Sequence, residues 1–299
     1  MQDNVYELGT EKVNPDTLKI DTASTAEVLR MMNDEDHKVA EAVKKVLPVV
    51  EEVVDKVVTS ISSGGRLIYM GAGTSGRLGV LDAVECPPTF SVGSDVVVGL
   101  IAGGERAFVK AVEGAEDNEG LGASDLAALQ LSPEDTVVGI AASGRTPYVI
   151  GGLRYAREVG AVTVALSCNE GARISEEAEH KIEVNVGPEA LTGSTRLKAG
   201  TAQKLVLNMI STASMIKLGK AYGNLMVDVN ISNYKLERRA VGIIRDITGT
   251  DEDTALKTLK LAHNEVKASI VMIKLGCGYD EAKDRLRDAN GYVRVAIEE

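Results

Sequence analysis

The sequence contains few of the residues on which several kinds of binding site depend. Among its 299 residues there is no Trp and there are two Phe, and aromatic side chains amount to 3%. Base-stacking platforms and aromatic sugar-binding shelves are therefore not expected. It has three His, and its three Cys are widely spaced with no CxxC pair, which argues against a zinc site or a disulfide framework and fits a reducing compartment.

An excess of positive charge and long apolar runs are also missing. The chain has 33 Lys and Arg against 44 Asp and Glu, a net charge of −11, which argues against sequence-independent binding to nucleic acid or anionic lipid. No apolar run approaches the roughly 18 residues that span a bilayer. The first residues lack the basic and apolar pattern of a signal peptide. We therefore expect a cytoplasmic protein without a nucleic-acid or membrane partner.

The centre of the chain has the pattern of an α/β fold. Apolar residues make up 44% and charged residues 26%, a globular composition. Short Val- and Ile-rich runs alternate with helical stretches and are often followed by Gly, Ser and Thr. The pattern predicts a doubly wound parallel sheet with helices on both faces. The runs cover residues 67–70, 96–101, 136–141, 162–166 and 182–186.

Helical patterns flank this centre. Ser24 and Glu27 form a capping box after a polar arm, and Pro48 should kink or divide a long amphipathic helix over residues 41–61. The last 60 residues read as helical with a repeat of period 27, so two helix–turn–helix units are predicted. We therefore divide the chain into an N-terminal arm and helix (1–45), a sheet domain (46–233) and a small all-helical domain (234–299). The repeat matches Ala255, Leu259, Ala262, Val266 and Ile270 with Ala282, Leu286, Ala289, Val293 and Ile297.

Three hydroxyl-rich loops at predicted helix starts are candidate anion sites. Free backbone N–H groups and hydroxyls at a helix start can cradle a phosphate, and ligands of open α/β sheets bind at the carboxyl ends of strands. The first loop lacks the spacing of a dinucleotide or Walker motif, so a small phosphate is the better ligand. Plain helix capping is the alternative interpretation. The candidates are Thr74, Ser75 and Gly76 in the first loop, Ser143, Gly144, Arg145 and Thr146 in the second, and Ser194 and Lys198 in the third.

Two glutamates are candidates for proton transfer. Glu85 is expected just past the helix that follows the first loop, where two prolines would fix its backbone. Glu116 follows the second predicted strand. The alternative is that both are solvated surface residues, and on chemistry alone Glu113, Asp117 and Glu119 are equally eligible.

A polar segment near the end of the central domain could line a pocket. It comprises residues 224–228 together with Asn230 and Asn233. Hydrogen bonding in loops and helix caps is the alternative role for these side chains.

Five blocks of sequence resemble the N-acetylmuramic acid 6-phosphate etherases, a family built on a sugar isomerase (SIS) domain. The resemblance implies a cytoplasmic homodimeric enzyme of peptidoglycan recycling that needs no cofactor. It implies a sugar phosphate substrate whose lactyl ether is cleaved with water to N-acetylglucosamine 6-phosphate and D-lactate, with Glu85 and Glu116 catalytic. The blocks are 67–79, 85–89, 139–148, 192–204 and 224–228.

The implied reaction requires little more than two carboxyl groups. Opening of the sugar to its aldehyde acidifies the C2 proton, one carboxylate removes it, and a carboxylic acid protonates the departing lactate. By analogy with the family Glu85 is the proton donor and Glu116 the base, but the sequence itself does not decide between them.

Two other functions remain open at this point. The glucokinase regulatory protein is similar to these etherases and binds sugar phosphate without catalysis, although it carries two SIS modules in a much longer chain. A phosphosugar isomerase is the third possibility.

Overall fold

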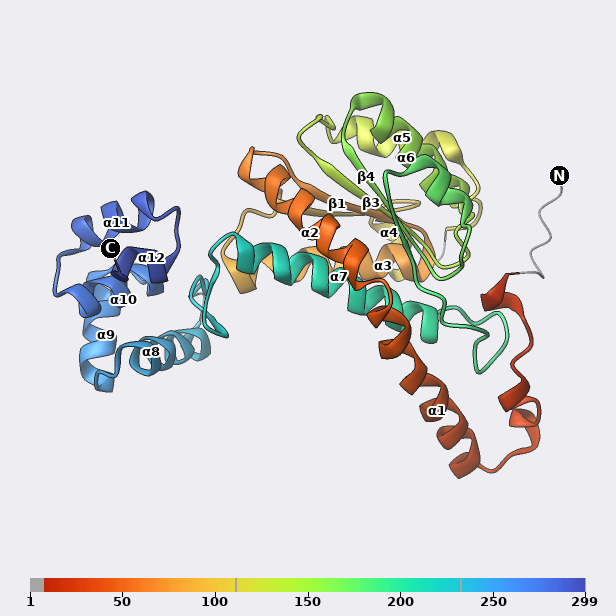
Figure 1. Ribbon diagram of the computed structural model, residues 1–299, viewed down its shortest axis with the longest axis horizontal. Coiled ribbons are helices and arrows are strands. Elements are labelled where there is room, and N and C mark those ends of the chain that lie inside the picture. The colour runs from red at the N-terminus through yellow and green to blue at the C-terminus, as the bar shows by residue number, and fades with distance from the viewer. Residues whose placement is uncertain (1–7, 111, 232, 299) are drawn as a thin grey trace. The chain divides into compact units, whose positions relative to one another are not determined.

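The computed structural model describes residues 8–110, 112–231 and 233–298, which form two compact units (Figure 1). The sheet unit comprises Met1–Val84 and Asp95–Ser211, and the helical unit comprises Glu85–Ser94 and Thr212–Glu299. Helices α3 (Gly73–Phe90) and α7 (Lys198–Lys217) each contribute residues to both units. The helical unit therefore includes residues that precede the domain boundary expected near residue 233.

The sheet unit contains the predicted parallel sheet. Its five strands follow the order β2-β1-β3-β4-β5 and pair in parallel throughout. The last strand ends earlier than predicted because its neighbour β4 ends at Ser167, which pairs with Glu183; Val184 and Val186 are buried but lie beyond the ladder. The strands are β1 (Leu67–Gly71), β2 (Val97–Ile101), β3 (Thr136–Ala141), β4 (Val162–Ser167) and β5 (His180–Glu183).

Helices cover both faces of the sheet, as the buried strands require (Figure 1). Helices α5 (Glu119–Ala128) and α6 (Pro147–Val159) pack on the face that carries Ile68 and Met70. On the opposite face, the Tyr69 hydroxyl donates to the Leu207 carbonyl of α7. Ser60 of α2 (Leu47–Ser62) lies 2.8 Å from the Thr136 hydroxyl on that same face. The alternation of side chains along each strand thus serves two helical layers.

Helices α5 and α6 touch backbone to backbone. A Cβ atom at Gly122 would lie 2.0 Å from the Tyr148 carbonyl oxygen, and one at Gly151 would lie 2.0 Å from the Glu119 carbonyl oxygen. Both contacts are shorter than any side chain allows, so glycine is what lets the two helices approach.

The N-terminal elements follow their sequence signals. The capping box is formed, since Ser24 and Glu27 exchange hydrogen bonds at the start of α1 (Thr25–Lys44). Pro48 lies in the first turn of α2 and divides the amphipathic stretch over residues 41–61, whose first residues belong to α1 and whose remainder forms α2. Between residue 8 and α1, the described part of the polar arm forms three short 3-10 turns. They are η2 (Gly9–Glu11), η3 (Pro15–Thr17) and η4 (Ile20–Thr22); later short elements are α4 (Arg106–Val109) and η5 (Arg173–Glu177).

The helical unit bears out the predicted repeat. Helices α9 (Glu252–Leu261) and α10 (Val266–Leu275) match α11 (Tyr279–Asp288) and α12 (Val293–Glu298). All but one of the matched apolar positions are buried, and the exception, Ile297, is partly buried. The turns match too, since His263 and Asn264 have φ of 54° and 67°, and Asn290 and Gly291 have 51° and 81°. Helix α8 (Tyr234–Thr248) precedes the repeat in the chain.

A small hairpin before α8 was not predicted. Strands β6 (Ala221–Tyr222) and β7 (Leu225–Met226) pair antiparallel around Gly223 and Asn224. A two-residue Gly-Asn turn is a known hairpin signal, and Gly223 has the positive φ of 58° that it requires. Among the described residues, no helix combines the length and apolarity needed to cross a bilayer.

We predict that Gly151→Ala destabilises the protein by about 1–3 kcal/mol, because the added methyl group forces α5 and α6 apart. Gly242→Ala is the matched control, since Gly242 lies within α8 and a Cβ atom there meets nothing within 4 Å. That change should stabilise by about 0.5–1 kcal/mol through helix propensity. Urea unfolding measures both, and equal shifts of the two midpoints would contradict the close approach.

Candidate active site

The strand order brings two of the predicted loops together. From β1 the chain continues to β2 on one side, and from β3 it continues to β4 on the other, so the connections diverge between β1 and β3. Gly71 at the end of β1 pairs with Ile140 of β3. The loops after these strands therefore open side by side at the carboxyl edge of the sheet, where ligands of such folds bind.

The first loop forms the start of α3 around a buried hydroxyl. Ser75 is buried, and its Oγ donates a hydrogen bond of 3.0 Å to Oε1 of Gln203. Thr74 beside it is half-buried. A Cβ atom at Gly76 would lie 2.5 Å from the Gly71 carbonyl oxygen, so glycine allows the helix start to lie against the strand. The backbone N–H groups of this turn are those of a helix N-terminus.

Gln203 is a candidate binding residue that the sequence analysis did not single out. Its side chain, from α7, is 1% exposed, and its Nε2 has no hydrogen-bond partner among the described residues. A buried amide donor without a partner costs about 1–3 kcal/mol. A ligand oxygen bound at Ser75 would give that donor an acceptor. No local pattern marks Gln203, since its importance comes from the packing of α7 beside the first loop.

The second loop presents hydroxyls that do not serve as helix caps. Thr146 is the residue before α6, yet its side chain makes no capping bond. Ser143 is half-buried and accepts a hydrogen bond of 3.3 Å from the backbone N–H of Arg145. Gly144 has φ of 70°, and a Cβ atom there would lie 2.4 Å from Cβ of Ala172. Plain helix capping, the alternative for this loop, does not account for Thr146.

The third loop differs from the expectation. The N-terminus of α7 already holds an anion, because the buried Glu189 carboxylate accepts from the N–H groups of Lys198 (2.9 Å) and Ala199 (3.0 Å). Burial raises the pKa of Glu189. A phosphate is therefore not needed at this helix start. Ser194, half-buried in the same loop, donates its backbone N–H to the Leu191 carbonyl.

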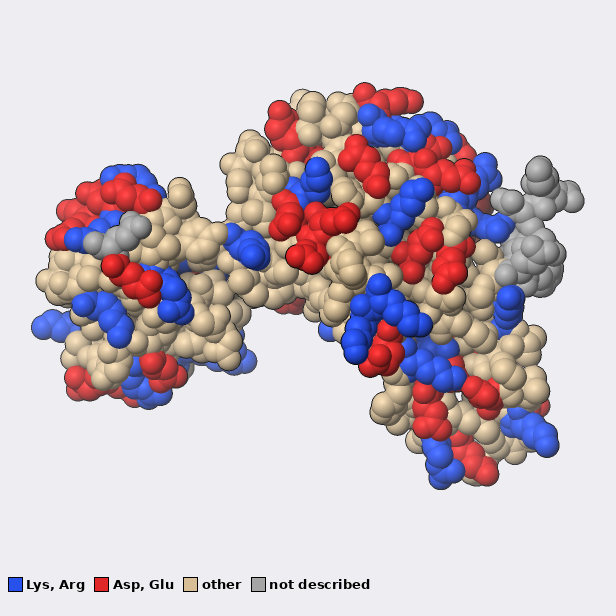
Figure 2. Space-filling view, in the orientation of Figure 1, with Lys and Arg blue, Asp and Glu red and all other residues tan. Residues whose placement is uncertain are grey.

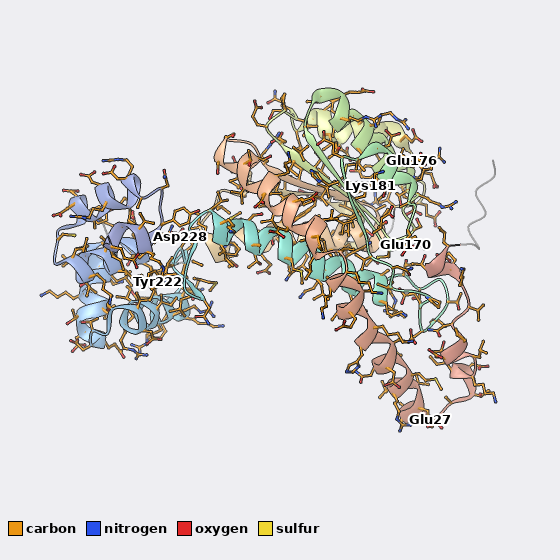
Figure 3. The ribbon with its side chains drawn as sticks, viewed as in Figure 1. Glu27, Glu170, Glu176, Lys181, Tyr222 and Asp228 are labelled. Carbon is orange, nitrogen blue, oxygen red and sulfur yellow. The ribbon has the colours of Figure 1, made fainter. Side chains whose placement is uncertain are left out.

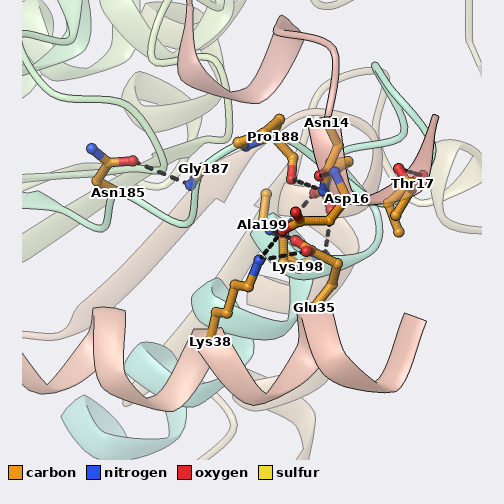
Figure 4. A network of polar contacts seen from close by, with 12 residues as sticks. Asn14, Asp16, Thr17, Glu35, Lys38, Asn185, Gly187, Pro188, Lys198 and Ala199 are labelled. Atoms are coloured by element: carbon orange, nitrogen blue, oxygen red, sulfur yellow. Dashed lines mark hydrogen bonds and ion pairs between the residues drawn. The ribbon is translucent and has the colours of Figure 1, made fainter. Parts of the chain in front are cut away.

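Lys198 is used inside the protein. It is 1% exposed and its ammonium forms an ion pair with Glu35 of α1, itself 2% exposed (Figure 4). Lys38 donates to the other oxygen of Glu35 at 2.6 Å. Burial acts to raise the pKa of Glu35, but the hydrogen bonds from Lys198 and Lys38 outweigh it and hold the pKa below its ordinary value of 4.5. We therefore leave Lys198 out of the proposed substrate contacts.

The N-terminal arm is fastened beside this ion pair. The Asn14 side chain donates to the Pro188 carbonyl at 3.2 Å, and the Thr17 hydroxyl donates to the Ala190 carbonyl at 2.9 Å (Figure 4). The two acceptors, Pro188 and Ala190, are the sequence neighbours of Glu189. The arm and α1 thus hold the segment that caps α7, the helix that carries Gln203.

Glu85 lies on a helix and not beyond one. Helix α3 continues through Pro87 and Pro88 to Phe90, contrary to the expectation that the prolines end it. A proline removes only its own N–H bond, and the N–H of Ser91 still bonds to the Pro87 carbonyl at 3.0 Å. Ser91, with φ of 48°, then ends the helix. The Glu85 side chain is exposed.

Glu116 lies in the loop before α5, and its backbone ties it to the second hydroxyl loop. Its carbonyl oxygen accepts a 3.0 Å hydrogen bond from the N–H of Tyr148, two residues after Thr146, while its side chain is exposed. Glu119 is different, because it forms an ion pair of 2.9 Å with Arg154. The structure therefore favours Glu116 over Glu119 as the group with a side chain available for chemistry.

The sheet unit by itself brings together the two hydroxyl loops, Gln203 and the backbone of Glu116. Glu85 belongs to the helical unit. On the face of the sheet unit shown in Figure 2, acidic and basic side chains are interspersed. The groups of this unit that could hold an anion are hydroxyls, the Gln203 amide, the Arg145 guanidinium and the backbone N–H groups at the helix start.

Comparison with protein families gives three matches. Residues 49–157 match the N-terminal SIS domain of glucokinase regulatory protein, residues 117–213 match the SIS domain, and residues 223–270 match the C-terminal lid domain of glucokinase regulatory protein.

Two curated relatives match nearly the whole chain. One is the N-acetylmuramic acid 6-phosphate etherase of Geobacillus sp. (strain WCH70), 59% identical over 97% of this chain and 99% of its own. The other is the enzyme of that name from Bacillus subtilis (strain 168), 57% identical over 99% of this chain and 97% of its own.

A solved structure shares the fold. It is a Bacteroides fragilis NCTC 9343 protein described as a phosphosugar isomerase involved in capsule formation, with a TM-score of 0.50 and 16% identity over 67% of this chain and 95% of that chain. At this identity the likeness concerns the fold alone.

We predict that Lys198→Met destabilises the protein by about 3 kcal/mol at pH 7, because Glu35 keeps a buried charge without its closest partner. The stabilisation from Glu35 is complete above its unfolded pKa and is lost as pH falls through its lowered folded pKa. The difference between the two proteins should therefore shrink below about pH 4. Urea unfolding at pH 7 and pH 3.5 measures this.

Lys44→Met is the control for that experiment. Lys44 lies 4.0 Å from Glu41, and both side chains are more than 70% exposed. Its removal should shift stability by less than about 0.5 kcal/mol. A Lys198→Met effect no larger than that of Lys44→Met would show that the buried ion pair contributes nothing.

Proposed function

The chain belongs to the N-acetylmuramic acid 6-phosphate etherase family, and we propose that it cleaves the lactyl ether of N-acetylmuramic acid 6-phosphate with water. The products are N-acetylglucosamine 6-phosphate and D-lactate, in the recycling of peptidoglycan sugars. The structural observation that supports this best is the pair of hydroxyl loops at the point where the strand order diverges, with the buried amide of Gln203 beside them.

In this proposal the two loops hold the phosphate of the substrate. Neutral donors joined by the single cation Arg145 suit a dianion in a protein whose net charge is −11, because they bind it without a large basic surface. The Gln203 amide completes the first loop. The proposed contacts are Thr74, Ser75, Gly76 and Gln203 from one side and Ser143, Gly144, Arg145 and Thr146 from the other. Ser194, in the loop that precedes α7, is a further proposed contact.

Glu116 and Glu85 then act as base and acid. The open-chain aldehyde acidifies the C2 proton, and Glu116 removes it. The C3–O bond breaks, a C2–C3 double bond forms, and lactate leaves with a proton from Glu85. Water then adds its oxygen to C3 as Glu85, now a carboxylate, takes up the proton that the water loses, and Glu116 returns its proton to C2. Elimination of lactate and addition of water together cause no net oxidation or reduction. We therefore propose a reaction without a cofactor.

We propose that the protein is a homodimer and acts in the cytoplasm. Exposed apolar side chains near the free edge of β2, Phe108 and Val109, support a contact between copies. The free thiols of Cys168 and Cys277 support a reducing compartment. Light scattering of the purified protein tests the dimer directly.

The decisive assay is release of D-lactate from N-acetylmuramic acid 6-phosphate. A regulator that only binds sugar phosphate, the function suggested by the glucokinase regulatory protein matches, would bind the substrate and release none. An isomerase would convert a sugar phosphate without forming lactate.

Replacing either glutamate should slow lactate release by about 10²–10⁴-fold, as expected for loss of a general acid or base. With Glu116→Gln, exchange of the C2 hydrogen with deuterated water should stop, whereas Glu85→Gln should retain some exchange. The reverse pattern would exchange the two roles. Glu119→Gln is the control and should remain active; unchanged lactate release from both variants would remove Glu85 and Glu116 from the mechanism.

Gln203→Leu should separate binding from stability. The change removes one buried donor without a partner but leaves the buried Ser75 hydroxyl without its acceptor, so the two effects offset and stability should change little. The loss of a hydrogen bond to the phosphate should lower kcat/KM about ten- to a hundred-fold. Ser143→Ala should give a similar loss, and Thr201→Val, at an exposed α7 position, should give none. Equal turnover of the dephosphorylated sugar would contradict the phosphate contacts.

A further inference from the structure

The helical unit contains a cavity that the proposed reaction does not use. Its volume is about 730 Å³, within the range of small-molecule sites. One wall is the segment after β7, which includes Asp228 (labelled in Figure 3). The Ser91 hydroxyl fastens this wall by donating to the Asp228 carbonyl at 2.5 Å.

The opposite wall comes from the internal repeat. The turn between α9 and α10 and the equivalent turn between α11 and α12 both line the cavity. Their left-handed residues, His263 and Asn264 in one and Asn290 and Gly291 in the other, hold each turn in the same shape. The equivalent turns of the two repeat copies thus line the same cavity.

The cavity is rich in positive charge although the chain as a whole carries −11. Four cationic side chains line it against two carboxylates. Lys220 and Lys267 share one partner, since their ammonium groups lie 3.1 Å and 2.6 Å from the same oxygen of Asp228. The remaining lining charges are Lys283, paired with Glu265 at 2.6 Å, and Arg287, whose pairing with Asp284 is exposed to solvent.

The buried lysine makes this arrangement costly without a ligand. Lys267 is only 12% exposed, and burial lowers its pKa in spite of Asp228. A second ammonium on the same carboxylate leaves one positive charge without its own counter-ion. The first turn of α10, which also lines the cavity, has no side-chain cap at Glu265, so its backbone adds to the positive potential.

We propose that this cavity binds a small phosphomonoester or phosphate dianion, held by Lys220, Lys267 and Arg287, as a second site separate from the one in the sheet unit. The charge surplus calls for an anion of more than one negative charge. Asn230, Asn264 and Asn290 supply amide groups for hydroxyls or phosphate oxygens. No Trp, Tyr or Phe is among the lining residues, so a nucleobase would find no stacking partner and a sugar phosphate is favoured over a nucleotide.

Titration calorimetry of the full chain with inorganic phosphate and with glucose 6-phosphate tests the proposal. Lys220→Met is the informative variant, because Asp228 keeps Lys267 and no carboxylate is left unpaired. It should weaken binding at this site about ten- to a hundred-fold. Arg287→Met, at an exposed position whose ion pairs lie on the surface, should weaken it as well. Lys274→Met, on an exposed position of α10 outside the cavity, is the matched control and should change affinity less than two-fold.

Ser143→Ala distinguishes the two sites. Phosphate binding in the helical unit should persist in that variant, whereas phosphate binding in the sheet unit, which rests on the proposed etherase function, should weaken. A single site per chain that weakens in both Ser143→Ala and Lys220→Met would overturn a separate site. Equal losses of affinity in Lys220→Met and Lys274→Met would also overturn it. So would an affinity that Lys220→Met leaves unchanged. Tighter binding of glucose 6-phosphate than of phosphate would identify a sugar phosphate as the ligand, and the reverse would identify the free anion.

Discussion

The constraint on which the sheet unit depends is the divergence of the chain between β1 and β3. Parallel strands joined by right-handed crossovers must leave their loops at one edge, and a change in winding direction opens a crevice there. The pairing of Gly71 with Ile140 brings the first and second loops to that crevice. The close approach of Gly76 to Gly71 then positions the start of α3 beside the crevice. The hydrogen bond from the Tyr148 N–H to the Glu116 carbonyl positions the loop that carries Glu116.

The sheet unit treats two similar helix starts in opposite ways. At α7 the N-terminal N–H groups are occupied by the protein's own Glu189, and the neighbouring Lys198 is neutralised by Glu35. At α3, by contrast, the buried Gln203 amide beside the helix start adds a donor in place of an acceptor. One helix start is thereby closed by internal charge and serves stability, while the other is the one that we propose binds the phosphate of the substrate.

Much of this arrangement could be predicted from the sequence, because the signals are local. Strand runs, the Ser24 capping box and the effect of Pro48 follow from periodicity and cap chemistry. The closing of α7 by Glu189 could not be predicted, since Glu189 lies nine residues before Lys198, and Glu35 is 163 residues away from it. Only tertiary packing decides whether a charged residue in a helix-start motif faces a ligand or a buried partner. The prediction that the prolines after Glu85 end the helix was wrong for a related reason. A proline weakens a helix locally, but α3 continues through Pro87 and Pro88 to Phe90.

The internal repeat shows how duplication can create a binding surface as well as a core. Burial of the matched apolar positions explains why both copies keep the same helices. It does not explain why equivalent turns, with different residues at the left-handed positions, line one cavity among four cationic side chains. Asn233 caps α8, as a purely structural role would predict, whereas Asp228 carries two lysines at the cavity wall. Placing two ammonium groups on one carboxylate is unfavourable for a core, so the charge arrangement, more than the fold of the repeat, is what points to an anionic ligand.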